Sequence, residues 1–202
     1  MRSQLTHATQ QHQRHSLRLK DYDYSQEGAY FVTICTQNHK LLLGEIRNAE
    51  MVLNEYGKIV AECWQWLSKQ YRHVELDEWV LMPNHMHGIV ILCRGGSRTA
   101  PTENYKPLGR LIGAFKTTST KRINVLQRTP GNRIWQRNYY EHAIRNEGDL
   151  NEISQYILDN PVQWDMDENN PTRQLPEPPY DNMVGARHAV PPAVRRQGCQ
   201  LK

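Results

Sequence analysis

The order of the predicted strands and helices is the feature that most constrains the fold of this chain. Segments rich in β-branched and aromatic residues, or alternating in polarity, predict strands at 29–38, 74–82, 85–92 and 133–144. Apolar residues recurring every three or four positions predict helices at 54–70, 107–126 and 147–160. The resulting order, β-α-β-β-α-β-α, predicts an α+β fold with a ferredoxin-like antiparallel sheet and helices packed on it.

The two ends of the chain differ from this central part. Residues 1–20 contain Lys, Arg and His but no acidic residue, and we interpret them as a basic extension. Residues 166–202 are rich in Pro, Asn and Arg and lack periodicity, so we expect a poorly ordered tail. The folded domain is therefore expected to cover residues 21–165.

Cysteine usage and hydropathy favour a cytoplasmic protein. The four cysteines are widely scattered and form no CxxC pair, which argues against a zinc ribbon or a disulfide framework. The longest apolar run, "IVILC" at 89–93, is too short to span a bilayer, and no signal-peptide segment follows Met1. We expect a soluble protein without a membrane partner.

The charge distribution points to a polyanion as the partner. Between residues 104 and 140 there is no Asp or Glu, although the segment contains eight Lys or Arg residues. Clustered cations bind phosphates, so this stretch favours nucleic acid over the alternative of a solvated helix face. The candidate DNA contacts are Arg110, Lys116, Lys121, Arg122 and Arg137.

The segment "PNHMHG" at 83–88 contains a candidate metal half-site. In a strand, His85 and His87 would point to the same face, while the residue between them faces the other way. Two imidazoles so placed can bind a divalent ion, although such pairs are often structural or chance features. The chain has no HExxH motif, no zinc-deaminase pattern and no phosphate-binding glycine loop.

The third predicted helix supplies a possible complement in "QYILDNP" at 155–161. Tyr156 and Asn160 are four positions apart and share one side of the helix. Two histidines and the Asn160 amide oxygen could hold Mg²⁺ or Mn²⁺, and Tyr156 could attack a phosphate as a covalent nucleophile. The alternative for Tyr156 is a half-buried core tyrosine. Tyr139 and Tyr140 are weaker candidates for the nucleophile.

With these motifs the chain resembles the HUH single-tyrosine transposases, most closely the REP-associated tyrosine transposases of bacteria. The matching segments follow the family's order over about residues 20–165: "GAYFVTICT", "MPNHMHGIVIL", "FKTTSTKRIN", "WQRNYYEHAIRN" and "YILDNP". The resemblance implies a ferredoxin-like catalytic domain, a divalent metal ion, and cleavage of single-stranded DNA near hairpins through a 5′-phosphotyrosine.

The resemblance also assigns roles to individual residues. His85 and His87 match the metal ligands, Tyr156 matches the nucleophile, and Asn160 stands where the insertion-sequence relatives have glutamine as third ligand. Members of the family act as monomers or as homodimers, and the sequence leaves both open. A second hypothesis is a domesticated protein that binds hairpin DNA or RNA without cutting it. The three residues His85, His87 and Tyr156 favour the enzyme, because a binding protein needs none of them.

Overall fold

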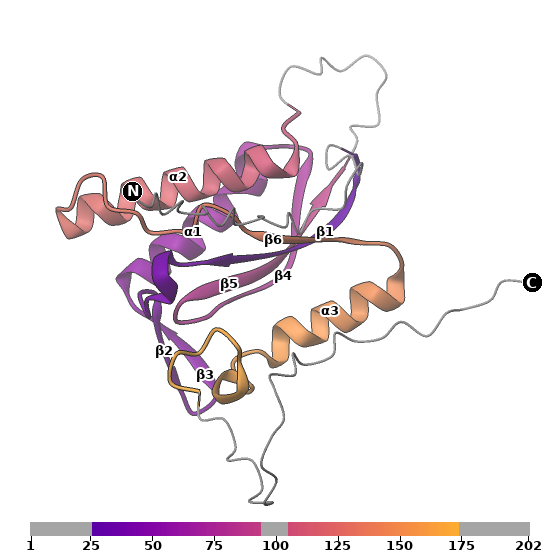
Figure 1. Cartoon of the computed structure of the whole chain (residues 1–202). Coiled ribbons are helices and arrows are strands. Elements are labelled where there is room, and N and C mark those ends of the chain that lie inside the picture. Colours follow the sequence, from indigo (N-terminus) through magenta and orange to yellow (C-terminus); the bar gives the residue numbers. More distant parts are fainter. Residues whose placement is uncertain (1–25, 94–104, 174–202) are drawn as a thin grey trace, which may run out of the picture.

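Four antiparallel strands form the central sheet of the computed structural model, which describes residues 26–93 and 105–173. Their order is β4-β5-β1-β6 (Figure 1). The strands are β1 (Gly28–Cys35), β4 (Val74–Leu81), β5 (His85–Leu92) and β6 (Tyr140–Ile144). The pairs β1–β5, β1–β6 and β4–β5 are all antiparallel. The predicted α+β fold is confirmed.

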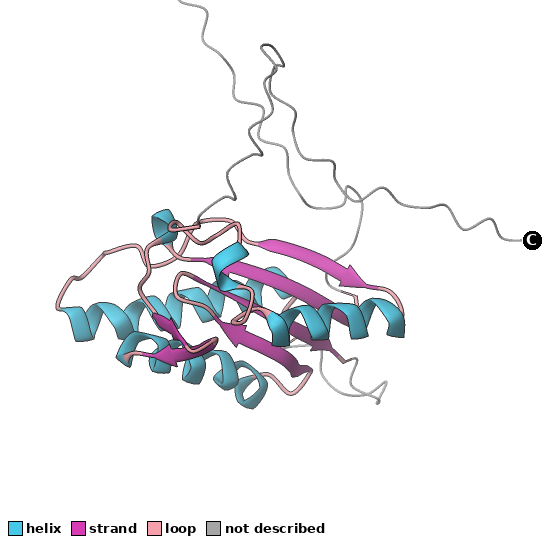
Figure 2. Cartoon of the chain, turned by 90° about the horizontal axis from the view of Figure 1, so that it is seen from below, coloured by secondary structure: helices cyan, strands magenta, loops and turns pink. Residues whose placement is uncertain are grey.

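The three predicted helices form within a residue or two of their expected bounds. They are α1 (Glu55–Gln70), α2 (Leu108–Gln127) and α3 (Glu147–Asp159). The side chain of Asn54 caps α1 by accepting from the backbone N–H groups of Tyr56 and Gly57. Helices α1 and α2 cover one face of the sheet, and α3 lies on the other (Figure 1). Figure 2, seen from below, shows α3 in front of the strands.

Strand alternation divides the buried apolar residues between these two faces. Tyr30, Val32 and Val90 belong to the large cluster under α1 and α2. Phe31 and Ile89, one position away, belong to a small cluster with Ile157 of α3. Because side chains two apart share a face, the odd-numbered residues at the start of β5 must also face α3.

Two regions of regular structure differ from the prediction. The structure adds a hairpin, β2 (Gly44–Arg47) and β3 (Glu50–Leu53), before α1. The predicted strand 133–144 is regular only from Tyr140, apart from a single bridge between Thr36 and Trp135. Lys116 of α2 explains part of this difference, since its ammonium donates to main-chain carbonyls in the irregular part.

The packed chain also extends past the expected boundary at residue 165. After α3 it forms a short 3-10 helix, η3 (Trp164–Met166), and continues to residue 173. Asn170 is buried there, and its side-chain amide donates to the Trp164 carbonyl at 3.0 Å. Of residues 166–173, the part of the predicted tail that the structure describes, Asn170 is buried and Asp167, Asn169 and Arg173 are half-buried. The basic extension 1–20 and residues 174–202 lie outside the described residues. In the part that the structure describes, every helix is too short or too polar to cross a membrane.

Candidate active site

The two histidines of "PNHMHG" lie side by side on β5, on the face covered by α3. The tight turn before them closes with a hydrogen bond from the Met82 N–H to the His85 carbonyl, at 2.9 Å. Both rings are buried, and their Nε2 atoms are 3.0 Å apart. The prediction that His85 and His87 share a face therefore holds in the structure.

Hydrogen bonds to the opposite side of each ring fix its orientation. The Asn84 amide donates to the carbonyls of His39 and Asn169, so its Oδ1 atom faces His85 Nδ1, at 2.8 Å. A carbonyl oxygen can only accept, so His85 Nδ1 bears the proton and Nε2 presents a lone pair. His87 Nδ1 lies 2.8 Å from the Thr33 hydroxyl on β1. Partners of this kind commonly orient histidines that bind metal ions.

Asp167 is a potential ligand that sequence reasoning missed. Its Oδ2 atom lies 3.5 Å from His85 Nε2. Ligand atoms of His85, His87 and Asp167 all lie within 4.8 Å of one another. Asp167 follows η3, in the segment that composition placed in the tail. No local pattern marks it, because it reaches the site through tertiary contacts such as the bond between the Asn84 amide and the Asn169 carbonyl.

Tyr156 and Asn160 of α3 converge on the same place. The Tyr156 hydroxyl lies 3.3 Å from His87 Nε2, and the side chain is 43% exposed. Asn160 is buried, and its Oδ1 atom has no hydrogen-bond partner among the described residues. Both residues line a pocket of about 290 Å³ together with Asp167. Side chains predicted to cooperate across 69 positions of sequence thus meet in space.

Burial and charge determine the protonation of these groups. Burial lowers the pKa of His85, with Asp167 opposing the shift, so the ring is neutral near pH 7. Burial and the neighbouring His85 lower the pKa of His87. Burial and then Asp167 raise the pKa of Tyr156, and the amide of Asn160 opposes them. The phenol is therefore protonated and needs activation before it can act as a nucleophile.

The donor set fits a divalent cation. Neutral His85 and His87 offer imidazole nitrogens, Asp167 offers a carboxylate, and Asn160 offers an amide oxygen without a partner. Nitrogen donors suit transition metals, and oxygen donors suit Mg²⁺ and Mn²⁺. The negative Oδ2 atom of Asp167 near the His85 lone pair repels it unless a positive charge lies between them. The residues present therefore fit the expected metal ion.

An aromatic surface adjoins Tyr156. The Phe31 ring stacks on His87 with centroids 5.5 Å apart, and it meets Tyr156 and Tyr140 edge-on at 6.1 and 6.2 Å. Tyr140 is 41% exposed on this face, whereas Tyr139 packs against the large core. The two tyrosines face opposite ways, and Tyr140 is the one beside the site.

The five residues predicted to contact DNA do not gather around this pocket. Arg110, Lys116, Lys121 and Arg122 lie on α2, across the sheet from α3 (Figure 1). Arg110 and Lys121 are exposed, and Arg122 pairs with Glu62 of α1. Lys116 donates to the carbonyls of Gln136 and Asn138, each at 3.0 Å, and Arg137 is exposed in the same segment. Their role in DNA binding stays a prediction.

The chain is similar to several known proteins. No family model matches the chain. It is 38% identical over 173 residues to a protein of Haemophilus influenzae named only "Uncharacterized protein", covering 78% of this chain and 93% of that one, so the two belong to one family. It is 27% identical over 140 residues to the REP-associated tyrosine transposase of Escherichia coli, covering 69% and 70%. A solved structure of a REP-associated tyrosine transposase bound to a REP hairpin shares the fold, with a TM-score of 0.50 at 22% identity over 72% of this chain and 74% of that chain.

Proposed function

We propose that this chain is a tyrosine transposase of the REP-associated type. It would cleave and rejoin single-stranded DNA beside hairpins through a 5′-phosphotyrosine. The observation that carries the proposal is the contact between the Tyr156 hydroxyl and His87 Nε2, at 3.3 Å, beside the pocket that Tyr156 lines with Asp167 and Asn160. Likeness to the Escherichia coli transposase supports it independently.

Tyr156 would act as the nucleophile in the cleavage step. Its oxygen forms a bond to phosphorus, the bond from phosphorus to the 3′ oxygen of the preceding nucleotide breaks, and that oxygen leaves as a hydroxyl. The half-exposed ring is open to DNA, and Phe31 supports it from the sheet. A divalent ion held by His85 and His87, with Asp167 or Asn160, would withdraw charge from the phosphate and favour the phenolate.

The same residues would serve the rejoining step. The phosphotyrosine ester conserves the energy of the broken bond, so a DNA hydroxyl can reverse the reaction without ATP. This feature distinguishes strand transfer from hydrolysis, in which water would take the phosphate. An enzyme with this site would therefore move DNA ends rather than only cut them.

Covalent trapping tests the proposal. The full chain is incubated with labelled single-stranded hairpin DNA from beside its own gene and with Mg²⁺ or Mn²⁺, and a DNA–protein adduct is sought on a denaturing gel. Wild type and Tyr140→Phe should form the adduct, and Tyr156→Phe should not. An adduct with Tyr156→Phe, or none with wild type, would show the mechanism to be wrong.

One observation favours the alternative of hairpin binding without cleavage. Asp167 and Glu168 line the same pocket as Tyr156, and both raise the pKa of its phenol. Without a bound cation these carboxylates would also repel a phosphate. The alternative predicts that wild-type protein shifts labelled hairpin DNA on a native gel. It also predicts no covalent DNA–protein adduct with either Mg²⁺ or Mn²⁺.

A further inference from the structure

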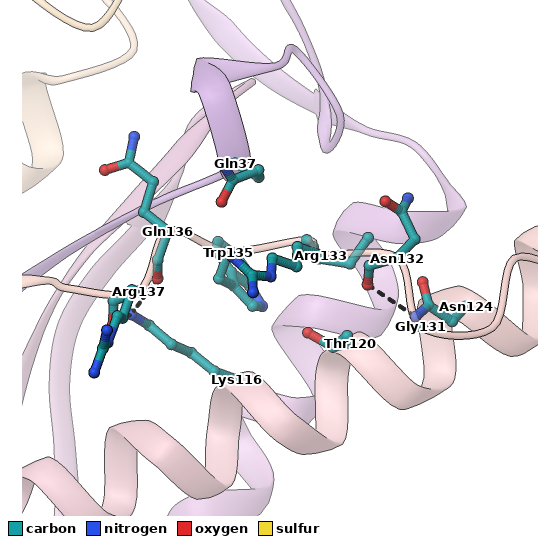
Figure 3. Close-up of a pocket in the computed structure, with 11 residues that line it drawn as sticks. Gln37, Lys116, Thr120, Asn124, Gly131, Asn132, Arg133, Trp135, Gln136 and Arg137 are labelled. Carbon is teal, nitrogen blue, oxygen red and sulfur yellow. Dashed lines mark hydrogen bonds between the residues drawn. The ribbon is translucent and has the colours of Figure 1, made fainter.

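A second and larger pocket lies across the sheet from α3. Its volume is about 710 Å³, which is in the range of small-molecule sites. Figure 3 shows it between the C-terminal half of α2 and the segment 131–137. Neither the metal ligands nor Tyr156 line it. The pocket is therefore separate from the candidate active site.

The lining of this pocket is basic and rich in amides. No acidic residue lines it among the residues that the structure describes. The guanidinium groups of Arg133 and Arg137 form no ion pair with any described residue. Arginine forks and Asn or Gln amides recognise phosphates and the hydrogen-bonding edges of bases. The amides come from Gln37, Asn124, Asn132 and Gln136.

Asn124 contributes an acceptor that the protein itself leaves unused. The residue is 8% exposed, and its amide nitrogen donates to the Asn132 carbonyl at 2.9 Å (Figure 3). Its Oδ1 atom is buried and has no hydrogen-bond partner among the residues that the structure describes. A buried acceptor without a donor is unfavourable, so a local shift that exposed it to a donor group on a ligand would be compensated.

The wall formed by segment 131–137 is firmly held. Trp135 is buried, and its indole N–H donates to the Ser119 hydroxyl at 2.9 Å. The Lys116 ammonium binds the carbonyls of Gln136 and Asn138. These contacts tie the segment to α2, so the pocket is formed in the absence of a ligand and would not need to order itself on binding.

A short chain of contacts connects this pocket to the histidine pair. Gln136 Nε2 lies 2.9 Å from His39 Nε2, the Asn84 amide donates to the His39 carbonyl, and Asn84 Oδ1 contacts His85. Burial and then the charge of Asp167 raise the pKa of the Cys35 thiol at the end of β1, and the charge of Lys116 opposes them. These contacts suggest the end of the sheet around which a bound strand would pass.

We propose that this pocket binds an unpaired nucleotide of the same DNA single strand that is cleaved at Tyr156, several nucleotides away from the cleaved phosphate. The assignment rests on the proposed function for its DNA substrate, but binding in the pocket needs neither the metal ion nor the nucleophile. The lining amides would contact the base, with Asn124 Oδ1 joining them after a local shift, and Arg133 and Arg137 would contact its edge or phosphate. Binding here would select the cleavage position by its base.

Fluorescence anisotropy of the full chain tests the pocket apart from catalysis. Tyr156→Phe protein without divalent ions is titrated into labelled single-stranded DNA of mixed sequence. Adding Arg133→Ala or Arg137→Ala should weaken binding roughly tenfold. The control, Arg72→Ala, removes an equal charge from an exposed site after α1 and should change binding less than about twofold. Equal effects of the pocket and control variants would overturn the proposal.

Abasic scanning distinguishes base recognition from simple charge attraction. With the same protein, one base of the DNA is removed at a time. The affinity should fall when the base removed is the one that the pocket binds. Asn132→Ala should weaken binding of the intact DNA and should abolish that positional effect. A positional effect that persists unchanged in Asn132→Ala would contradict the assignment. If wild type forms no covalent adduct while these binding results hold, the proposed cleavage fails and the pocket assignment stands.

Discussion

The Nε2 atoms of His85 and His87 face each other across 3.0 Å in the protein interior. His85 Nδ1–H donates to Asn84 Oδ1, so Nε2 of that ring directs a lone pair into the gap. Burial disfavours a second proton on either ring. Both Nε2 atoms therefore lie where one divalent cation could bind them, in place of the hydrogen bond between the two rings.

Binding of Mn²⁺ should stabilise the folded protein. At free Mn²⁺ about a hundredfold above its Kd, the free energy of unfolding should rise by about 2.7 kcal/mol, because the ion binds only the native arrangement. Thermal unfolding with and without Mn²⁺ measures the effect. His87→Ala should remove the Mn²⁺-dependent increase, whereas His142→Ala should keep it, since His142 pairs with Asp149 at the start of α3. Equal increases in both variants would exclude the histidine pair as the ion site.

The third ligand can be identified by comparing two substitutions. Asp167→Asn should weaken Mn²⁺ binding about 10- to 100-fold, because it removes a charge within 3.5 Å of His85. Asn160→Ala should weaken it less, because a neutral amide oxygen contributes less to a divalent ion. Isothermal titration of each variant gives the two affinities. The reverse order would identify Asn160 as the principal oxygen ligand, as the family resemblance implies.

Gly88, the glycine of the histidine motif, should tolerate no larger residue. A Cβ atom there would lie 2.7 Å from the buried Trp64 ring and 3.1 Å from Trp79 Cβ. Gly88→Ala should therefore lower the free energy of unfolding by about 1–3 kcal/mol in urea titrations. Gly113→Ala is the matched control, since nothing lies within 4 Å of its new Cβ in α2. It should raise stability by about 0.5–1 kcal/mol, and a loss at this control would undermine the comparison.

Lys116 should make stability depend on pH in the alkaline range. Burial lowers the pKa of its ammonium from 10.5 to about 8. Between these values the unfolded chain binds more protons at this residue, so the free energy of unfolding rises with pH. After allowance for solvent screening, the rise is about 1–2 kcal/mol. Urea titrations from pH 8 to pH 10.5 give the free energy of unfolding at each pH. It should rise more steeply with pH in wild type than in Lys116→Met. Parallel curves would mean that Lys116 keeps its proton.

The parts of the fold that local patterns encode were predictable. Alternation defined the strand 85–92 to the residue and placed both histidines on one face. The spacing of Tyr156 and Asn160 placed them on one side of α3, and both lie in the site pocket. These features depend on residues close together in sequence, where strand and helix periodicity act directly.

The parts that distant contacts decide were not predictable. Residues 133–139 have the composition of a strand, but Trp135 enters the core and Lys116 takes carbonyls that a ladder would use. Asp167 lies in a segment without periodicity and reaches the site because Asn84 binds the Asn169 carbonyl, 85 positions away. Neither contact leaves a pattern in the neighbouring sequence.

The unequal division of the core between the two faces of the sheet has an evolutionary consequence. The large cluster under α1 and α2 provides most of the stabilising burial, whereas the side that bears the histidines and Tyr156 buries only Phe31, Ile89 and Ile157 in its own cluster. Replacing the half-exposed Tyr156 therefore removes little of the apolar burial that stabilises the fold. Descendants of this chain could lose the nucleophile while inheriting the scaffold.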